Sequence, residues 1–198
     1  MGDHARSLIE RWLPLYPSSN PWIDDSAREA LRRSEDRWLD TFKGAGSLAP
    51  AQVRDLINWK WQGYPAKRIK SWRGVDSDWS HTSTCIERAL AESDASADNA
   101  VAALRGRTGG IPNWETAMAS VVLAACRPAL YTVVDSRALR TLMLLEGRPT
   151  GEIQRVGWFP PSRWLGYLST CRELSAELKV SLRDLDRAFW AANGNDEP

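Results

Sequence analysis

Residues 104–140 are the most informative about the fold and read LRGRTGGIPNWETAMASVVLAACRPALYTVVDSRALR. The stretch opens at the end of one helix, passes through a glycine-rich turn at 106–113 and continues as a helix of small and apolar residues to residue 126. A short extended run at 131–134 then leads to Asp135, where a further helix begins. The predicted order is therefore helix, hairpin, helix, extended segment, and a helix with an acid at its start.

The turn has the chemistry that binds a phosphate group. Glycines let the chain adopt positive φ and approach a phosphate with no Cβ in the way. The helix that follows points unpaired N–H groups and a partial positive charge toward the same place. Two arginines flank the turn, with no acid between them and Glu115. The residues expected at this contact with DNA are Arg105, Arg107, Gly109, Gly110, Ile111 and Asn113.

The same stretch resembles the helix-hairpin-helix (HhH-GPD) superfamily of base-excision DNA glycosylases. Residues 109–113 stand at the hairpin of that superfamily, with Pro112 in place of its second glycine, and 119–123 stand on the second hairpin helix. Residues 127–134 stand in the loop before the catalytic acid, and Asp135 stands at that acid. The resemblance implies an all-α, glycosylase-like fold of two helical lobes with a cleft between them.

The resemblance also implies a mechanism. A damaged or modified nucleotide leaves the duplex and enters a pocket, and the Asp135 carboxylate stabilises the positive charge that develops on the sugar. Bifunctional members of the superfamily use a lysine as an amine nucleophile, and 107–126 contains none. The implied activity is therefore that of a monofunctional N-glycosylase. Asp is also a common helix N-cap, and the two roles of Asp135 are compatible.

Two aromatic groups could line the base pocket. Trp59, Lys60 and Trp61 place two large rings around an ammonium, and a related Trp-Lys pair occurs in some archaeal-type oxoguanine glycosylases. Trp114 and Glu115 open the second hairpin helix, where members of the superfamily often place pocket residues. The alternatives are that the rings pack in the core and that Glu115 interacts favourably with the helix dipole.

The rest of the chain has helical periodicity, and we expect one domain over 1–198 whose N- and C-terminal helices pack together. The stripe predicted to face inward on the second helix contains Leu31, Trp38, Leu39 and Phe42. Residues 74–81 and 148–160 are expected to be loops. The expected helices are 3–16, 25–43, 47–63, 66–73, 82–92, 97–105, 114–126, 135–146, 161–179 and 182–193.

Composition excludes several classes of protein. Hydrophobic residues make up 43% of the 198, so the chain is not disordered by composition. There is no apolar run of the roughly 20 residues that span a bilayer, and no signal peptide. Cys85, Cys126 and Cys171 are widely spaced and odd in number, which argues for buried free thiols in a reducing compartment. With only two histidines, a metal site or a Ser/His/Asp site has little support.

We expect a monomer in the cytoplasm, associated with the bacterial nucleoid, that binds double-stranded DNA and needs no cofactor, metal or membrane.

Charge is unevenly distributed, although the net charge is only +1. Such asymmetry can place a basic face beside an acidic one. Apart from Asp55, the charged residues of 54–73 are Arg54, Lys60, Lys67, Arg68, Lys70 and Arg73. Apart from Arg88, those of 76–98 are Asp76, Asp78, Glu87, Glu92, Asp94 and Asp98.

Two other functions fit the same residues. One is a non-catalytic helix-hairpin-helix module that binds DNA within a repair or defence complex. The other is a helical protein-interaction domain unrelated to DNA. A pocket with Asp135 at its floor would separate the glycosylase from the first alternative, and a basic face holding the hairpin would separate both from the second.

Overall fold

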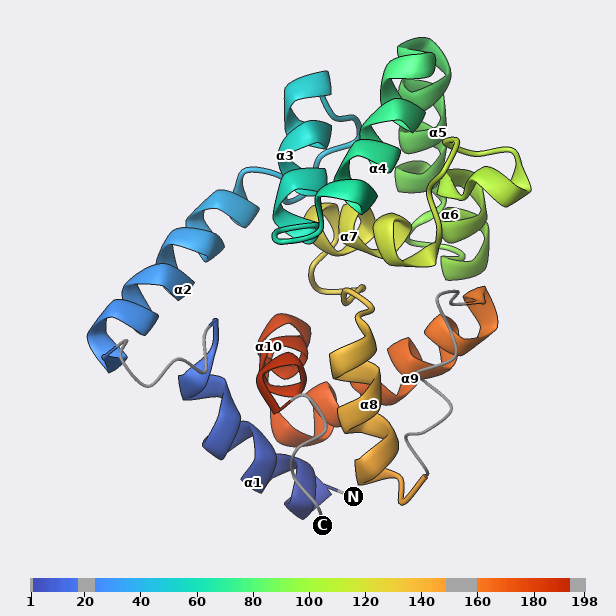
Figure 1. Ribbon diagram of the computed structural model, residues 1–198. Helices are drawn as coiled ribbons and strands as arrows, with labels where there is room; N and C mark the ends of the chain where they lie inside the picture. Colours follow the sequence, from blue (N-terminus) through green and yellow to red (C-terminus); the bar gives the residue numbers. More distant parts are fainter. Residues whose placement is uncertain (1, 18–23, 149–159, 193–198) are drawn as a thin grey trace. The chain divides into compact units, whose positions relative to one another are not determined.

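The computed structural model describes residues 2–17, 24–148 and 160–192, and within these ranges the regular structure is entirely helical (Figure 1). The all-α prediction is thereby confirmed. The elements are α1 (Gly2–Trp12), η1 (Leu13–Leu15), α2 (Asp25–Asp40), α3 (Pro50–Lys60), α4 (Pro65–Ser77), α5 (Trp79–Glu92), α6 (Ala97–Leu104), η2 (Gly106–Thr108), α7 (Thr116–Cys126), α8 (Ser136–Leu145), α9 (Pro161–Leu178) and α10 (Leu182–Ala192).

The chain folds into two compact units. Unit 1 takes the described residues of Met1–Thr41, Val134–Gly157 and Gly166–Pro198, and unit 2 takes those of Phe42–Val133 and Trp158–Leu165. The chain passes from unit 2 to unit 1 between Val133 and Val134. The N-terminal helix α1 and the C-terminal helix α10 thus belong to the same unit, and they pack against each other.

Unit 1 is organised around α10, which packs against α8, α1 and η1. The apolar side of α10 is wholly buried at Leu185, Ala188 and Phe189. The Thr141 hydroxyl of α8 donates to the Phe189 carbonyl at 2.8 Å, which satisfies a buried polar group at the helix contact. Burial of one large apolar side chain stabilises a fold by about 2 kcal/mol, so the buried side of α10 contributes to the stability of the unit.

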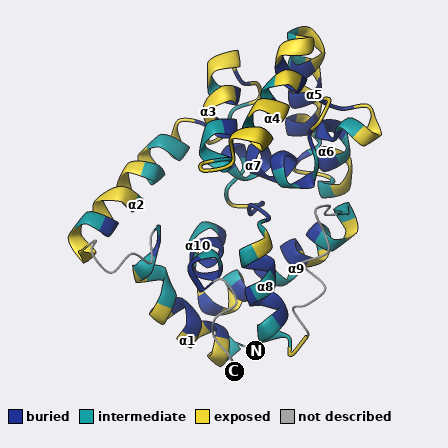
Figure 2. Ribbon diagram, viewed as in Figure 1, coloured by how far each residue is buried: buried dark blue, intermediate teal, exposed yellow. Residues whose placement is uncertain are grey.

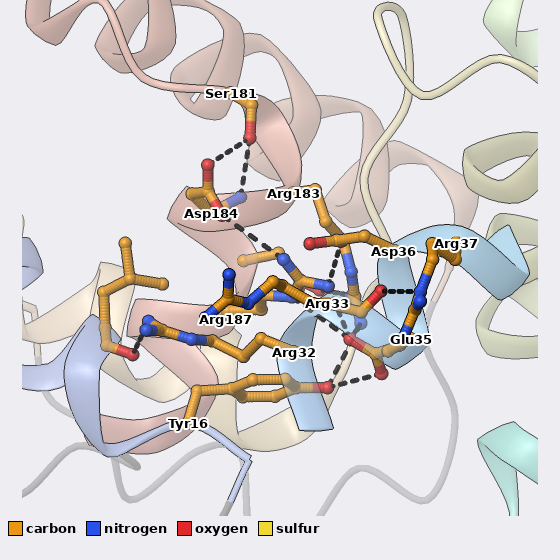
Figure 3. Close-up of polar contacts among 12 residues, drawn as sticks. Tyr16, Arg32, Arg33, Glu35, Asp36, Arg37, Ser181, Arg183, Asp184 and Arg187 are labelled. Carbon is orange, nitrogen blue, oxygen red and sulfur yellow. Dashed lines mark hydrogen bonds and ion pairs between the residues drawn. The ribbon is translucent and has the colours of Figure 1, made fainter. Parts of the chain in front are cut away.

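A buried ionic cluster joins η1, α2 and α10 within unit 1 (Figure 3). Glu35 of α2 lies 2.7 Å from the Arg187 guanidinium and 2.9 Å from that of Arg183, both on α10. Arg187 also pairs with Asp36, and the Tyr16 hydroxyl donates to Glu35 at 2.8 Å. Burial would raise the pKa of Glu35, but the two arginines and the hydrogen bonds outweigh it and lower that pKa to about 2.

Unit 2 is built on α7, which is buried along almost its whole length (Figure 2). Its small residues, among them Ala119 and Ser120, let α3, α5 and α6 approach closely. The first turn of α9 adds Trp164, whose ring stacks on Tyr131 at a centroid distance of 5.9 Å. Residues 131–134 are extended and buried but form no strand.

Several expectations about the elements need correction. The predicted loop at 74–81 is wrong, because α4 continues to Ser77 and α5 begins at Trp79. Asp78 alone separates the two helices and caps the second by accepting from the His81 amide at 3.0 Å. Helix 3–16 is shorter than expected, because Pro14 turns the chain into the 3-10 segment η1. The expected loop at 148–160 lies almost wholly outside the described residues.

The inward stripe predicted for α2 is also wrong in part. Leu31 is 48% exposed, and Trp38 and Leu39 are only half-buried, whereas Phe42 is buried beyond the end of the helix. The buried residue of α2 is Arg28. Polar contacts such as those of Glu35 hold this helix, and periodicity alone does not reveal them. All three cysteines are buried free thiols, as predicted.

Candidate functional site

The predicted hairpin is a closed turn between α6 and α7. The Gly110 amide donates to the Arg105 carbonyl at 2.8 Å, and the Ile111 amide donates to the Leu104 carbonyl at 3.1 Å. On the other side, the Gly106 amide donates to the Trp114 carbonyl at 3.0 Å. These bonds satisfy the backbone groups at the end of α6 and fix the shape of the turn.

Glycine is required in the hairpin for two different reasons. Gly109 has φ +83° with open space around its Cα, so its role is conformational. A Cβ on Gly110 would lie 2.5 Å from the Leu104 carbonyl carbon and 2.6 Å from the Ala103 carbonyl oxygen, so its role is steric. Asn113 also has positive φ, at 65°, which asparagine tolerates better than most residues.

Helices α4 and α5 hold the hairpin from outside it. The Trp114 indole N–H donates to the Ser71 carbonyl of α4 at 3.3 Å. A Cβ on Gly74 would clash with the Pro112 carbonyl oxygen, so α4 contacts the hairpin backbone directly. On α5, the His81 ring nitrogen Nε2 lies 3.1 Å from the Gly110 carbonyl oxygen. The hairpin is therefore a supported element of unit 2.

Glu115 pairs with both hairpin arginines. Its carboxylate lies 3.2 Å from the Arg105 guanidinium and 2.8 Å from that of Arg107. The Arg105 side chain is only 5% exposed, whereas that of Arg107 is 65% exposed. Arg105 thus lies in the interior of the unit, and Arg107 is the arginine of this pair that solvent reaches.

The other hairpin residues divide in the same way. Gly110 and Ile111 are buried and anchor the turn, whereas Gly109 and Asn113 are exposed, and we call these two residues the hairpin tip. An incoming phosphate could reach Arg107 and this tip. It could not reach Arg105 or Ile111 without rearranging the core.

The aromatic residues expected at a base pocket lie in unit 2, in different environments. Trp114 is completely buried, so it packs in the core. Trp59, Lys60 and Trp61 are half-buried. The Trp61 indole N–H donates to the Ser71 hydroxyl at 3.1 Å, and Ser71 also accepts from Trp114, so this serine brings the two tryptophans together.

Asp135 is the N-cap of α8. Its carboxylate accepts from the Arg137 amide at 2.9 Å, and the residue is half-buried. Burial raises the pKa of Tyr167 well above its ordinary value, and Cys171, Asp186 and Asp135 act in the same direction. Asp135 belongs to unit 1, whereas the hairpin and the candidate pocket residues belong to unit 2.

Three residues that support the hairpin have no recognisable signal in the sequence. Ser71, Gly74 and His81 contact the hairpin, but they are separated from it by about 30 residues or more of chain. A serine and a glycine inside a basic segment and a histidine near an acidic one do not indicate such a role. Their role is seen only in the folded structure, where α4 and α5 contact the hairpin.

In the described residues, no group of three or more His, Cys, Asp or Glu side chains is placed to hold a metal ion. No helix in that part of the chain is both long and apolar enough to cross a membrane. Comparison with protein-family models, with curated proteins and with solved structures finds no match to this chain.

Proposed function

We propose that this protein is a DNA-binding base-excision enzyme, a monofunctional N-glycosylase that removes a damaged or modified base. The observation that carries the proposal is the tightly held hairpin between α6 and α7, followed nine residues after α7 by an aspartate that caps α8. This is the order of parts that the superfamily resemblance leads one to expect.

The two parts have separate roles in the proposal. The exposed part of the hairpin would bind a phosphate through the Arg107 guanidinium and through the exposed backbone at Gly109 and Asn113. Asp135 would face the sugar of the extruded nucleotide, where a carboxylate stabilises an oxocarbenium-like transition state. The bond to the Arg137 amide fixes the carboxylate, so little reorganisation is needed during the reaction.

The proposal is tested by incubating the protein with duplexes that carry oxidised, alkylated or phage-type modified bases and assaying for abasic sites. Asp135→Asn should reduce excision by about a hundredfold or more, the scale of losing one preorganised electrostatic group. Asn caps helices about as well as Asp, so the melting temperature and the affinity for the duplex should be kept. Near-full excision by the variant would mean that Asp135 is only a helix cap.

The product distinguishes a monofunctional enzyme from a lyase. Because 107–126 has no lysine, the abasic sites should break only after alkali or heat, and borohydride should trap no covalent complex. A trapped adduct would contradict this part of the proposal. Lys60 would then be the first residue to replace, with Lys43, an exposed lysine of the same unit, as the matched control.

A non-catalytic helix-hairpin-helix module is the second candidate. Two observations favour it. Trp114 packs in the core, and Asp135 already has a structural role as the cap of α8. A wild-type protein that binds duplex DNA well but excises nothing from any of the three classes of lesion would make this the better description.

A further inference from the structure

A second cationic surface lies on unit 2, along the outer side of α4. We call it the α4 basic surface and define it by Tyr64, Lys67, Ile69, Lys70 and Arg73, all of which are exposed. The buried side of the same helix carries Ser71, Gly74 and Val75. The exposed side is coloured as such on α4 in Figure 2. The outer side of α4 therefore faces solvent, and packing in the core does not explain its cations and its aromatic ring.

No acidic residue lies between the cations of this surface along the helix. From Tyr64 to Val75 the chain contains no acidic residue. Asp76, the first acid that follows, pairs with Arg54 of α3 at 2.6 Å. Among the described residues, Lys67, Lys70 and Arg73 form no ion pair. Three cations without acids favour a polyanionic partner over an acidic side chain of the protein itself.

Aromatic rings lie among these cations. Tyr64 is 51% exposed, and the Lys67 ammonium lies 4.9 Å from the ring centres of both Tyr64 and Trp61. A cation held near two rings keeps its charge at the surface while the exposed part of the tyrosine stays available for stacking. Aromatic rings beside a basic track are the feature by which proteins hold unpaired nucleotides, since bases stack on the rings and phosphates contact the cations.

A membrane surface is a poorer fit to the same residues. A helix that lies in a bilayer interface needs a broad apolar face. On α4 the exposed apolar side chain is Ile69, at 43%, with Tyr64 just before the helix, and Val75 is buried in the core of the unit.

We propose that the α4 basic surface binds unpaired single-stranded DNA, with Lys67, Lys70 and Arg73 on phosphates and a base stacked on Tyr64. This binding goes beyond base excision, because it requires neither Asp135 nor a modified base. The same helix holds the hairpin through Ser71 and Gly74, so one rigid element would serve both DNA contacts.

The test measures the affinity of the whole protein for a fluorescent oligothymidine by anisotropy at several salt concentrations. The double variant Lys70→Gln, Arg73→Gln should weaken binding by about tenfold and lower the slope of log affinity against log salt by about 1.4, since each phosphate contact with a single strand contributes about 0.7. The matched control, Lys43→Gln with Arg88→Gln, removes the same charge from exposed positions of the same unit and should change neither value.

The aromatic contact has its own pair of variants. Tyr64→Ala should weaken binding of oligothymidine by about tenfold, within the range known for loss of one stacked base, and Tyr64→Phe should keep the wild-type affinity. Equal losses in both variants would exclude stacking. All of these variants change exposed residues, so their melting temperatures should equal that of the wild type. Differences in affinity for oligothymidine then do not reflect differences in folding.

Three outcomes would overturn the proposal. The first is a double variant that binds oligothymidine with the affinity and salt slope of the matched control. The second is a double variant that loses affinity for anionic phospholipid vesicles but keeps affinity for oligothymidine. The third is the pair of equal losses at Tyr64. Because the probe is unmodified and single-stranded, a failure of base excision does not affect this measurement.

Discussion

Glu115 is the residue on which the charge of the hairpin depends. Its carboxylate is 36% exposed and pairs with a buried arginine, Arg105, and an exposed one, Arg107. A buried guanidinium without its partner costs several kcal/mol, whereas an exposed pair contributes at most about 1 kcal/mol. The two contacts of one carboxylate therefore differ in what they do. The contact with Arg105 stabilises the fold, and the contact with Arg107 sets how much charge the hairpin presents.

Replacing Glu115 should separate these effects. Glu115→Ala should lower the free energy of unfolding by about 2 kcal/mol, because Arg105 stays buried with its charge uncompensated. Denaturant unfolding at neutral pH measures this. A variant as stable as the wild type would mean that solvent or another group compensates Arg105.

Arg107→Ala is the complementary change at an exposed site. It should alter stability by less than about 0.5 kcal/mol, since surface substitutions seldom do more. It should weaken binding to duplexes of all sequences alike and lower the salt slope by about 0.9, the contribution of one phosphate contact. If the affinity and the slope are those of the wild type, the hairpin does not contact DNA through this residue.

At the scale of the element, the hairpin is held from within by its glycines and from outside by α4 and α5. Gly110→Ala should disrupt it, because the new Cβ would lie 2.5–2.7 Å from backbone atoms of residues 103–105, which cannot rotate away. We expect a loss of about 3 kcal/mol, the upper range for overpacking. Gly109→Ala places its Cβ in open space and should cost about 1 kcal/mol for its positive φ alone.

The comparison of the two variants is the check, made by denaturant unfolding of each. Equal losses at neighbouring glycines would show that backbone conformation, and not crowding, determines both positions. Because Gly109 is at the exposed tip and Gly110 is not, Gly109→Ala is also the variant in which duplex binding can be measured with the fold intact.

At the scale of the whole molecule, the ionic cluster of unit 1 makes stability depend on pH. The pKa of Glu35 falls from 4.5 to about 2 on folding, so the folded state favours the ionised carboxylate. This contribution is fully present above about pH 4.5 and is lost as the pH falls toward 2. By linkage it is on the order of 3 kcal/mol. Its physical cause is the pair of arginines, Arg183 and Arg187, that Figure 3 draws around the carboxylate.

Glu35→Gln removes the titrating group but keeps its size. The variant should be less stable than the wild type at pH 7, and the difference should shrink as the pH falls from about 4.5 to 2. Urea midpoints at several pH values measure it. Asp40→Asn, which removes an exposed carboxylate from the same helix, serves as the control. A difference that stays constant with pH would mean that Glu35 acts through packing and not through its charge.

The positions of most helices and of the hairpin turn can be predicted from the amino-acid sequence. Helical periodicity, Asp135 at a helix start, and a run of glycines are local signals, because they act within a few residues of chain. The boundary at Asp78 shows the limit of such signals. A polar composition over 74–81 predicts a loop, yet α4 continues through the buried Gly74 and Val75 to Ser77, and Asp78 alone caps the start of α5.

Which of these residues face solvent depends instead on how the helices pack. Arg105 and Arg107 look equivalent in the sequence, but the packing of α6 against α7 buries the first and exposes the second. Leu31 looks like a core residue, but ionic contacts with α10 dock α2 and leave that leucine exposed. The physical reason is that burial depends on segments far apart in the chain. Arg187 pairs with Glu35 across about 150 residues of sequence, and a pattern within a few residues cannot indicate such a contact.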